Sequence, residues 1–159
     1  MAANQAMFHI RAVEPAEADA ISAIAMQSKA YWGYSADFMA ACEAELTYDA
    51  AMIESSAQTF IGAQAATALV GFYALAWRSS ECCELEALFV MPEYIGKGAG
   101  RELLEHAKQQ AVREGVPVMR IQGDPHAENF YRQAGARVVG MRESGSIAGR
   151  QLPLFEIAL

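Results

Sequence analysis

"MPEYIGKGAGRELLEHAK", residues 91–108, places Gly96, Gly98 and Gly100 at alternate positions directly before a helical pattern. An apolar run, "LEALFV" over residues 85–90, leads into this stretch, so the order is strand, glycine loop, helix. The glycines can simply supply a flexible turn. At a helix N-terminus, however, bare backbone also lets an anion approach the unpaired N–H groups. The stretch is therefore typical of a phosphate-binding loop.

Two common nucleotide-binding motifs do not fit this loop. The motif G-x-x-x-x-G-K-[ST] is absent because Lys97 is followed by Gly98. The dinucleotide motif G-x-G-x-x-G fails because its third glycine would fall at Arg101 or at Leu103. A nucleotide P-loop and a dinucleotide loop are both disfavoured.

Length and composition indicate one cytoplasmic domain over residues 1–159. Hydrophobic residues make up 53% and charged residues 19% of the chain, and no apolar run approaches the roughly 18 residues of a membrane span. The first residues, "MAANQAMFHIRAVEP", lack the basic and apolar regions of a secretory signal. We therefore expect a soluble protein with no membrane partner.

The charge and the cysteine content limit which partners and metals the protein is expected to bind. The formal net charge is −7 and no Lys/Arg cluster follows a nucleic-acid backbone, so we expect no nucleic-acid partner. The acidity fits a cationic ligand as well as plain solubility. Three cysteines, without C-x-x-C spacing, and three scattered histidines predict no metal site.

Hydrophobic periodicity predicts an α/β chain with a mixed, mostly antiparallel central sheet flanked by helices. Ser35 and Asp49 are suitable caps, and Gly115 and Gly135 suit helix ends. The predicted strands are residues 7–13, 59–64, 68–77, 83–90, 118–123, 137–141 and 152–159. The predicted helices are residues 15–30, 36–46, the long helix after the glycine loop, and 127–135.

In element order and in two motifs the whole chain resembles the GNAT acyltransferases, the Gcn5-related N-acetyltransferase superfamily. The family's pyrophosphate loop, Arg/Gln-x-x-Gly-x-Gly/Ala, is matched by Gly98, Ala99 and Gly100, with Ile95 where Arg or Gln is usual. A second motif, a helix ending in tyrosine before a glycine turn, is matched by "DPHAENFYRQAGA", which contains Tyr131.

The resemblance implies a single GNAT domain with acetyl-CoA as co-substrate. The loop would bind the pyrophosphate through main-chain N–H groups, and the strand before it would lie along the pantetheine arm. An N–H of Leu88 or Val90 would face the thioester oxygen. The residues expected to contact the cofactor are Leu88, Phe89, Val90, Ile95, Gly96, Lys97, Gly98, Ala99, Gly100, Arg101, Asp124, Asn129 and Tyr131.

Acetyl transfer to an amine needs a proton acceptor and a proton donor. A free primary amine has a pKa of about 10.4 and arrives protonated. Glu84 and Glu86 are candidate bases because they share one face of a strand, and Glu84 matches the position from which some family members supply their base. They can also merely line a solvated face. The resemblance makes Tyr131 the candidate proton donor to the departing thiolate, although it can also be only a packed ring.

Acceptor recognition is expected near "SKAYWGYS", residues 28–35, which contains Trp32 and Tyr34, with Glu43 and Glu45 close by. Aromatic rings and carboxylates suit a cationic amine. The same rings can instead close the core at a helix break. A homodimer is expected by analogy alone.

Two functions remain open. The first is an acetyl-CoA-dependent N-acetyltransferase that acetylates a primary amine, on a small molecule such as a cationic amine or else on a protein or peptide, by direct attack in a ternary complex. The second is a GNAT-fold module that binds acyl-CoA as a sensor without turnover.

Overall fold

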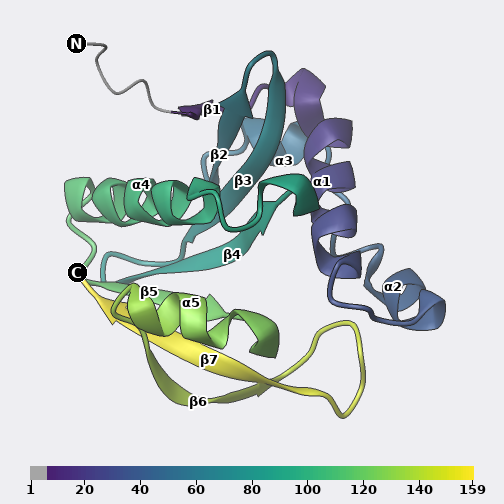
Figure 1. Cartoon of the computed structure of the whole chain (residues 1–159). Helices are drawn as coiled ribbons and strands as arrows, with labels where there is room; N and C mark the ends of the chain where they lie inside the picture. Colours follow the sequence, from purple (N-terminus) through teal and green to yellow (C-terminus); the bar gives the residue numbers. More distant parts are fainter. Residues whose placement is uncertain (1–6) are drawn as a thin grey trace.

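The computed structural model describes residues 7–159, which form one seven-stranded sheet with helices on both faces (Figure 1). The expected lack of a secretory signal concerns in part residues 1–6, which lie outside the described residues. Within residues 7–159, no helix has the length and apolar character needed to cross a membrane.

The sheet has the strand order β1-β2-β3-β4-β5-β7-β6, and only the β4–β5 pair is parallel. This confirms the predicted mixed, mostly antiparallel sheet. The strands are β1 His9–Ala12, β2 Gln58–Ala65, β3 Ala68–Trp77, β4 Cys82–Val90, β5 Val118–Gln122, β6 Arg137–Glu143 and β7 Gln151–Ala158. The helices are α1 Ala18–Ala30, α2 Ala36–Cys42, α3 Ala50–Glu54, α4 Ala99–Arg113 and α5 Glu128–Gln133, with 3₁₀ turns Pro15–Glu17, Pro92–Tyr94 and Pro125–Ala127.

The two predicted side-chain caps are confirmed, and one helix is shorter than predicted. Ser35 accepts a hydrogen bond from the Phe38 main chain, and Asp49 accepts one from Met52 and so begins α3. The predicted helix 36–46 ends at Cys42, because the Glu43 amide bonds only three residues back, to Ala40, and a turn follows. Local capping chemistry thus defined helix starts better than helix ends.

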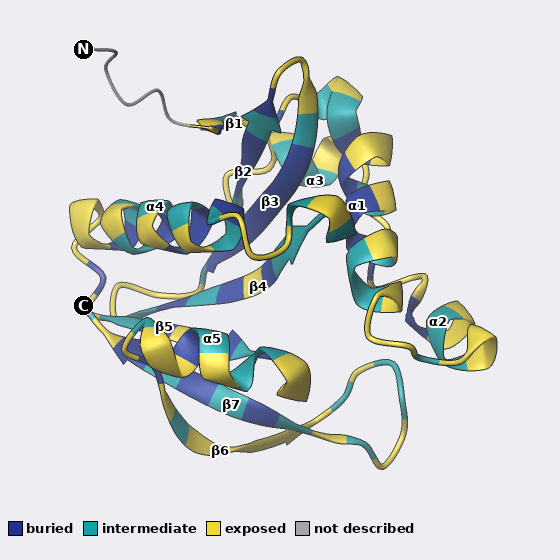
Figure 2. Ribbon diagram, viewed as in Figure 1, coloured by how far each residue is buried: buried dark blue, intermediate teal, exposed yellow. Residues whose placement is uncertain are grey.

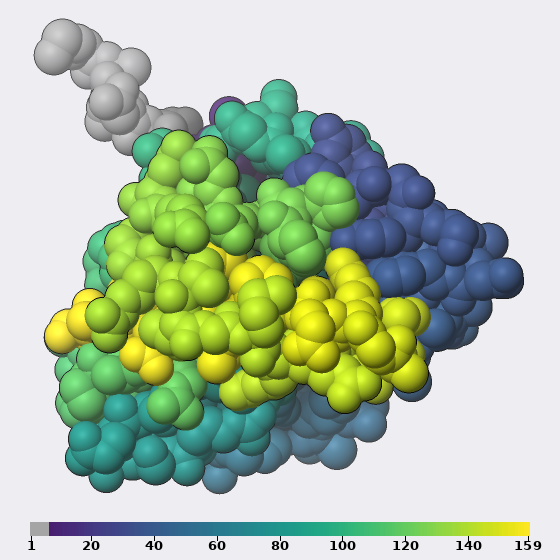
Figure 3. Space-filling view, turned by 90° about the horizontal axis from the view of Figure 1, so that it is seen from below, coloured from purple at the N-terminus to yellow at the C-terminus, as the bar shows by residue number. Residues whose placement is uncertain are grey.

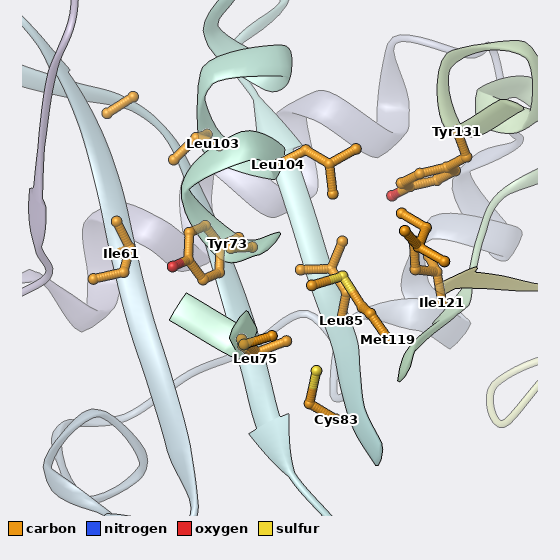
Figure 4. Packing of buried hydrophobic residues seen from close by; sticks show 14 of the residues in the cluster. Ile61, Tyr73, Leu75, Cys83, Leu85, Leu103, Leu104, Met119, Ile121 and Tyr131 are labelled. Atoms are coloured by element: carbon orange, nitrogen blue, oxygen red, sulfur yellow. The ribbon is translucent and has the colours of Figure 1, made fainter. Parts of the chain in front are cut away.

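Each face of the sheet has its own apolar core (Figure 2). On one face α4 and α5 contribute Leu103, Leu104 and Tyr131, which pack over strands β2 to β5 and β7 (Figure 4). On the other face α1 contributes Ile21 and Ile24. Because a fully buried aliphatic side chain stabilises a fold by roughly 1.5–3 kcal/mol, these two cores hold β4 rigidly between them.

Two irregularities in β4 create an open edge in the middle of the sheet. The β3–β4 register shifts so that Ala74 faces Ala87 but Leu75 faces Leu85, which leaves Glu86 as a bulge. On its other side β4 pairs with β5 only over Cys82–Leu85. Residues 86–90 therefore expose main-chain groups that no strand of the described chain pairs with on the β5 side.

Candidate active site

The glycine loop needs two of its glycines for their backbone conformation. Gly96 has φ +80° and Gly98 has φ +94°, a region that side chains other than glycine's rarely adopt. Crowding is not the reason, since an added Cβ at Gly96 would meet nothing within 4 Å and one at Gly98 only the Arg101 Nη2 atom at 4.0 Å. The positive φ values turn the chain sharply from the Pro92–Tyr94 turn into α4.

This turn leaves a row of unpaired donors at the start of the 15-residue helix α4. The Glu102 amide bonds to the Gly98 carbonyl, but in residues 7–159 no main-chain acceptor pairs with the amides of Gly98, Ala99, Gly100 and Arg101. Lys97 and Arg101 are exposed on the same loop. Free N–H groups, the positive end of the helix dipole and two cations together form a setting that favours an anion.

The remaining loop and strand residues lie beside this setting. An added Cβ at Gly100 would stand 3.4 Å from the Phe130 ring, so this glycine lets α4 approach α5. Ile95 is 38% exposed and Ala99 is buried. Along β4, Leu88 and Val90 pack toward the α4 side and Phe89 toward the α1 side. The open edge of β4 therefore starts at the bulge and ends at the glycine loop.

Tyr131 lies on α5 beside the open edge. Its ring is 6% exposed and packs on Phe130 and Phe155 at centroid distances of 5.2 and 5.3 Å. Gly123 makes room for it, because a Cβ there would lie 2.8 Å from Phe155 and 3.1 Å from Tyr131. Figure 4 shows the hydroxyl pointing from α5 toward β4.

The Tyr131 hydroxyl is a protonated and unengaged group. Within the described chain no hydrogen bond to it is found, and its oxygen is not fully enclosed. Burial, and then the charge of Asp124, raise the pKa of Tyr131 above its ordinary value. A neutral phenol that no protein group holds is available to a ligand in the open edge.

Glu84 and Glu86 do share one face, and arginines occupy it with them. Arg78 Nη2 lies 3.0 Å from Glu84 Oε2 and 2.6 Å from Glu86 Oε1. Arg142 donates to Glu84 Oε1 at 2.8 Å, and Gln58 donates to Glu86 Oε2 at 2.8 Å. Every carboxylate oxygen already accepts a hydrogen bond, so a proton delivered to either glutamate would compete with these donors.

A hollow of about 290 Å³ adjoins Glu84. It is lined by Arg78, Ser79, Cys82, Glu84, Arg120 and Arg142. A larger hollow, of about 580 Å³, lies at the C-terminal half of α4 and includes Val112 and Arg113, away from the glycine loop. The volume of a hollow therefore does not identify the candidate active site. The unpaired main-chain donors and the open edge of β4 identify it.

The expected aromatic residues of the acceptor region meet the segment after β5. The Tyr34 ring stacks on Phe38 with centroids 4.1 Å apart, and the Trp32 ring stacks on His126 at 4.9 Å. The Tyr34 hydroxyl donates to Asp124 Oδ2 at 2.7 Å. Figure 3 shows this face of the molecule, where the blue α1–α2 segment meets the yellow loop before β7.

The charged groups that lie over the Tyr34 ring are cations rather than the expected glutamates. Lys29 and Arg150 are the cations nearest to Tyr34, at 5.4 and 5.2 Å from its ring centroid. Glu45 instead contacts Ser146, and Glu43 is exposed. Glu45 and Glu86 do lie on one side of the sheet, since burial and then the charges of both raise the pKa of Tyr48. The glutamates thus gather around Tyr48 and the arginines rather than around Tyr34.

Asp124 is the centre of this contact between segments. It accepts from the His126 main chain at 2.9 Å and from Tyr34, and its side chain is 16% exposed. Burial alone would raise its pKa, but the bonds from Tyr34 and His126 outweigh burial and lower the pKa of Asp124 to about 2. Burial and the Asp124 bond raise the pKa of Tyr34 to about 12. Asn129 is exposed on α5.

Sequence reasoning missed the roles of Arg78, Arg142, Arg150 and Gly123. Arg150 and Tyr34 are bonded although 116 positions separate them. No local pattern announces such a contact, because it depends on how three loops come together. Around these residues and over the rest of residues 7–159, no cluster of three or more His, Cys, Asp or Glu side chains is arranged to hold a metal ion.

Comparison with known proteins gives a consistent family. Residues 25–136 match the model of the acetyltransferase (GNAT) family, so the chain belongs to that family. It is 34% identical over 74 residues to the peptidyl-lysine N-acetyltransferase YjaB of Escherichia coli (strain K12), a match that covers 46% of this chain and about half, 48%, of that protein.

Solved structures share the fold over nearly the full length. The PaiA N-acetyltransferase of Thermoplasma acidophilum, solved in complex with coenzyme A, has a TM-score of 0.80 at 23% identity and covers 96% of this chain and 99% of its own. A Gcn5-related N-acetyltransferase of Rhodopseudomonas palustris has a TM-score of 0.80 at 20% identity, with both chains covered completely. The predicted single-domain GNAT architecture is confirmed by this likeness of fold.

Proposed function

We propose that this protein is an acetyl-CoA-dependent N-acetyltransferase that acetylates a primary amine. One observation carries the proposal: unpaired amides at the glycine loop continue into the open edge of β4, and that edge ends beside a neutral tyrosine hydroxyl. The anion site and the extended hydrogen-bonding edge are therefore continuous, and the Tyr131 hydroxyl points from α5 toward the same strand (Figure 4). Membership of the GNAT family supports the same function.

The chain's own residues fit acetyl-CoA, which supplies the acetyl group as an activated thioester. The unpaired amides of Gly98, Ala99, Gly100 and Arg101 bind its pyrophosphate, and the exposed cations Lys97 and Arg101 add attraction. Main-chain groups of residues 86–90 pair with the pantetheine arm. An N–H of Leu88 or Val90 on this edge faces the thioester oxygen and stabilises the negative charge that develops on it.

The amine attacks the thioester directly while both substrates are bound. Its proton passes through water to Glu84, where the half-exposed Arg142 competes for Oε1. Tyr131 gives its proton to the thiolate. With ordinary pKa values of about 8.5 for a thiol and 10 for a phenol, this transfer is uphill by roughly 2 kcal/mol, and burial disfavours both anions alike.

A second function, an acyl-CoA sensor without turnover, has one observation in its favour. All four oxygens of Glu84 and Glu86 are already hydrogen-bonded, so no ready base faces the open edge. A sensor would bind acetyl-CoA at the same loop and need no base.

Thiol release from acetyl-CoA across a panel of amines separates the two functions. The panel includes a lysine-containing peptide, because YjaB acts on peptidyl-lysine, together with small mono- and diamines. Amine-dependent thiol release well above the rate without amine is the expected result. Tight acetyl-CoA binding by calorimetry with no amine-dependent release would establish the sensor instead.

A further inference from the structure

The cluster around Asp124 contains more positive than negative charge. Lys29 Nζ lies 3.3 Å from Asp124 Oδ2, and Arg150 Nη2 lies 3.6 Å from the same oxygen. Two cations therefore share one carboxylate, and they share one of its oxygens with the Tyr34 hydroxyl as well. His126 Nδ1, at 2.7 Å from Asp124 Oδ1, adds no negative charge.

These charged groups are too enclosed for water to offset the free-energy cost of the excess positive charge. The side chains of Lys29, Arg150 and Asp124 are only 15%, 19% and 16% exposed. The guanidinium of Arg150 lies over the Phe38 ring at 4.8 Å, which is a further desolvating contact. An enclosed cation without a matching anion is unfavourable, so the cluster is set up to take another negative group.

The neighbouring carboxylates do not supply that negative group. Glu45 contacts Ser146, and Glu143 Oε1 accepts from the Gly149 amide at 3.0 Å. In the described chain, Asp124 is the only carboxylate that forms an ion pair with Lys29 or Arg150. The missing anion must therefore come from outside the chain.

The cluster stands at the reacting end of the proposed site. Asp124 directly follows Gly123, and the Tyr131 ring packs against Gly123. The segments that meet here come from the end of α1, the segment after β5 and the loop before β7 (Figure 3). A group bound by Lys29 and Arg150 thus lies on the Asp124 side of Tyr131, at the expected acceptor region.

We propose that the acceptor amine carries a carboxylate, which Lys29 and Arg150 bind together. A guanidinium presents paired donors that match a carboxylate, and the ammonium of Lys29 adds a second charge-assisted bond. This inference rests on the proposed function and names its substrate class: amino acids or similar amines with an acidic end, rather than a purely cationic amine.

The test compares matched acceptors that differ only in the acidic group. The ω-amino acids from glycine to 6-aminohexanoate are assayed against their amides by thiol release from acetyl-CoA. The wild type should prefer the best acid over its amide by about tenfold or more in kcat/KM, chiefly through KM, as expected for one charge-assisted bond. Comparing this ratio between variants cancels the different basicity of acid and amide amines.

Three substitutions locate the preference. Arg150→Gln should bring the ratio of acid to amide in kcat/KM close to one. Arg150→Lys keeps the charge and should retain most of the preference. The control is Arg132→Gln, since Arg132 pairs with Glu128 on α5 at 3.1 Å and lies outside the cluster; it should behave as wild type. Thermal unfolding confirms that each variant is folded.

A binding experiment keeps the two proposals separable. Calorimetry measures N-acetyl-6-aminohexanoate and its amide against the complex of the protein with coenzyme A. If acids and amides react equally in the wild type, or Arg150→Gln keeps the full preference, the carboxylate inference is overturned and the acetyltransferase stands. If no amine reacts but the acid binds through Arg150, the acetyltransferase fails and the carboxylate site stands. If the acid neither reacts nor binds while other amines react, only the carboxylate inference is overturned; if no amine reacts and the acid does not bind, both are refuted.

Discussion

Replacing Tyr131 by phenylalanine removes one oxygen and keeps the ring. The Phe130 and Phe155 contacts and the fit against Gly123 all involve ring atoms, so they survive the change. The hydroxyl that is lost has no hydrogen-bond partner in residues 7–159. The substitution therefore tests chemistry with little effect on packing.

We expect Tyr131→Phe to have a small effect on stability and a large effect on the catalytic rate. Losing a hydroxyl that bonds no protein group and is not fully enclosed should change the free energy of unfolding by less than about 1 kcal/mol. Losing a general acid should lower kcat by roughly 10²–10⁴. Because burial raises the pKa of Tyr131, the tyrosine stays protonated at neutral and mildly alkaline pH. The ratio of wild-type to variant kcat should thus be constant between pH 6 and 9.

Tyr73→Phe is the matched control with the reverse behaviour. The Tyr73 hydroxyl is buried and bonds His106 Nδ1 at 2.8 Å, so its loss should cost about 1 kcal/mol of stability and leave kcat unchanged. Single-turnover thiol release and urea unfolding measure both quantities. Two results would refute the assignment of Tyr131 as proton donor. One is wild-type single-turnover kinetics in Tyr131→Phe. The other is a decrease in its free energy of unfolding as large as the increase in its activation free energy.

Three further results are expected. Gly98→Val forces a β-branched residue to φ +94°, at a cost of about 1–2 kcal/mol, and should weaken acetyl-CoA binding in calorimetry by about tenfold. The control Gly135→Val, with φ +95° in the turn after α5, should leave the affinity intact. Equal affinities in both variants would contradict the proposed anion site. Glu84→Gln should lower kcat/KM and flatten its rise with pH, while Glu156→Gln, whose carboxylate is also held by an arginine, should keep the wild-type profile. The pKa of Asp124 is lowered to about 2, so its contribution to stability is present above pH 4 and is lost as the pH falls toward 2. Urea unfolding should show the free energy of unfolding falling by about 2 kcal/mol over this range in the wild type but not in Asp124→Asn. The same dependence of unfolding free energy on pH in both proteins would contradict this.

The parts of the fold that local chemistry determines were predictable. Alternating apolar residues gave the strands, and Ser35 and Asp49 gave two helix starts, because each signal lies within a few residues of the element it forms. The glycines at 96 and 98 were predictable for the same reason, since positive φ is a property of one residue. The bulge at Glu86 was not, because a register shift exists only between two paired strands.

The candidate site divides in the same way. The glycine loop and the tyrosine after it follow from sequence motifs, whereas the surroundings of Glu84 and Tyr34 depend on long-range contacts. Arg142 reaches Glu84 across 58 positions and Lys29 reaches Asp124 across 95. An acidic sequence with net charge −7 suggested an acidic acceptor site, yet the local balance is set by which few side chains meet. Net charge describes the whole surface and not one cluster.

Gly123 and Asp124 join the two halves of the proposed reaction. The missing side chain at 123 lets Tyr131 approach the end of β5, and the next residue binds the segments that surround the acceptor. An acceptor carboxylate that binds Lys29 and Arg150 changes the ion pairs of Asp124, which is the residue next to Gly123, where the Tyr131 ring packs. Burial and the charge of Asp124 are also the two causes that raise the pKa of Tyr131. Acceptor binding and proton donation therefore meet at adjacent residues, and the matching acid should act chiefly by lowering KM.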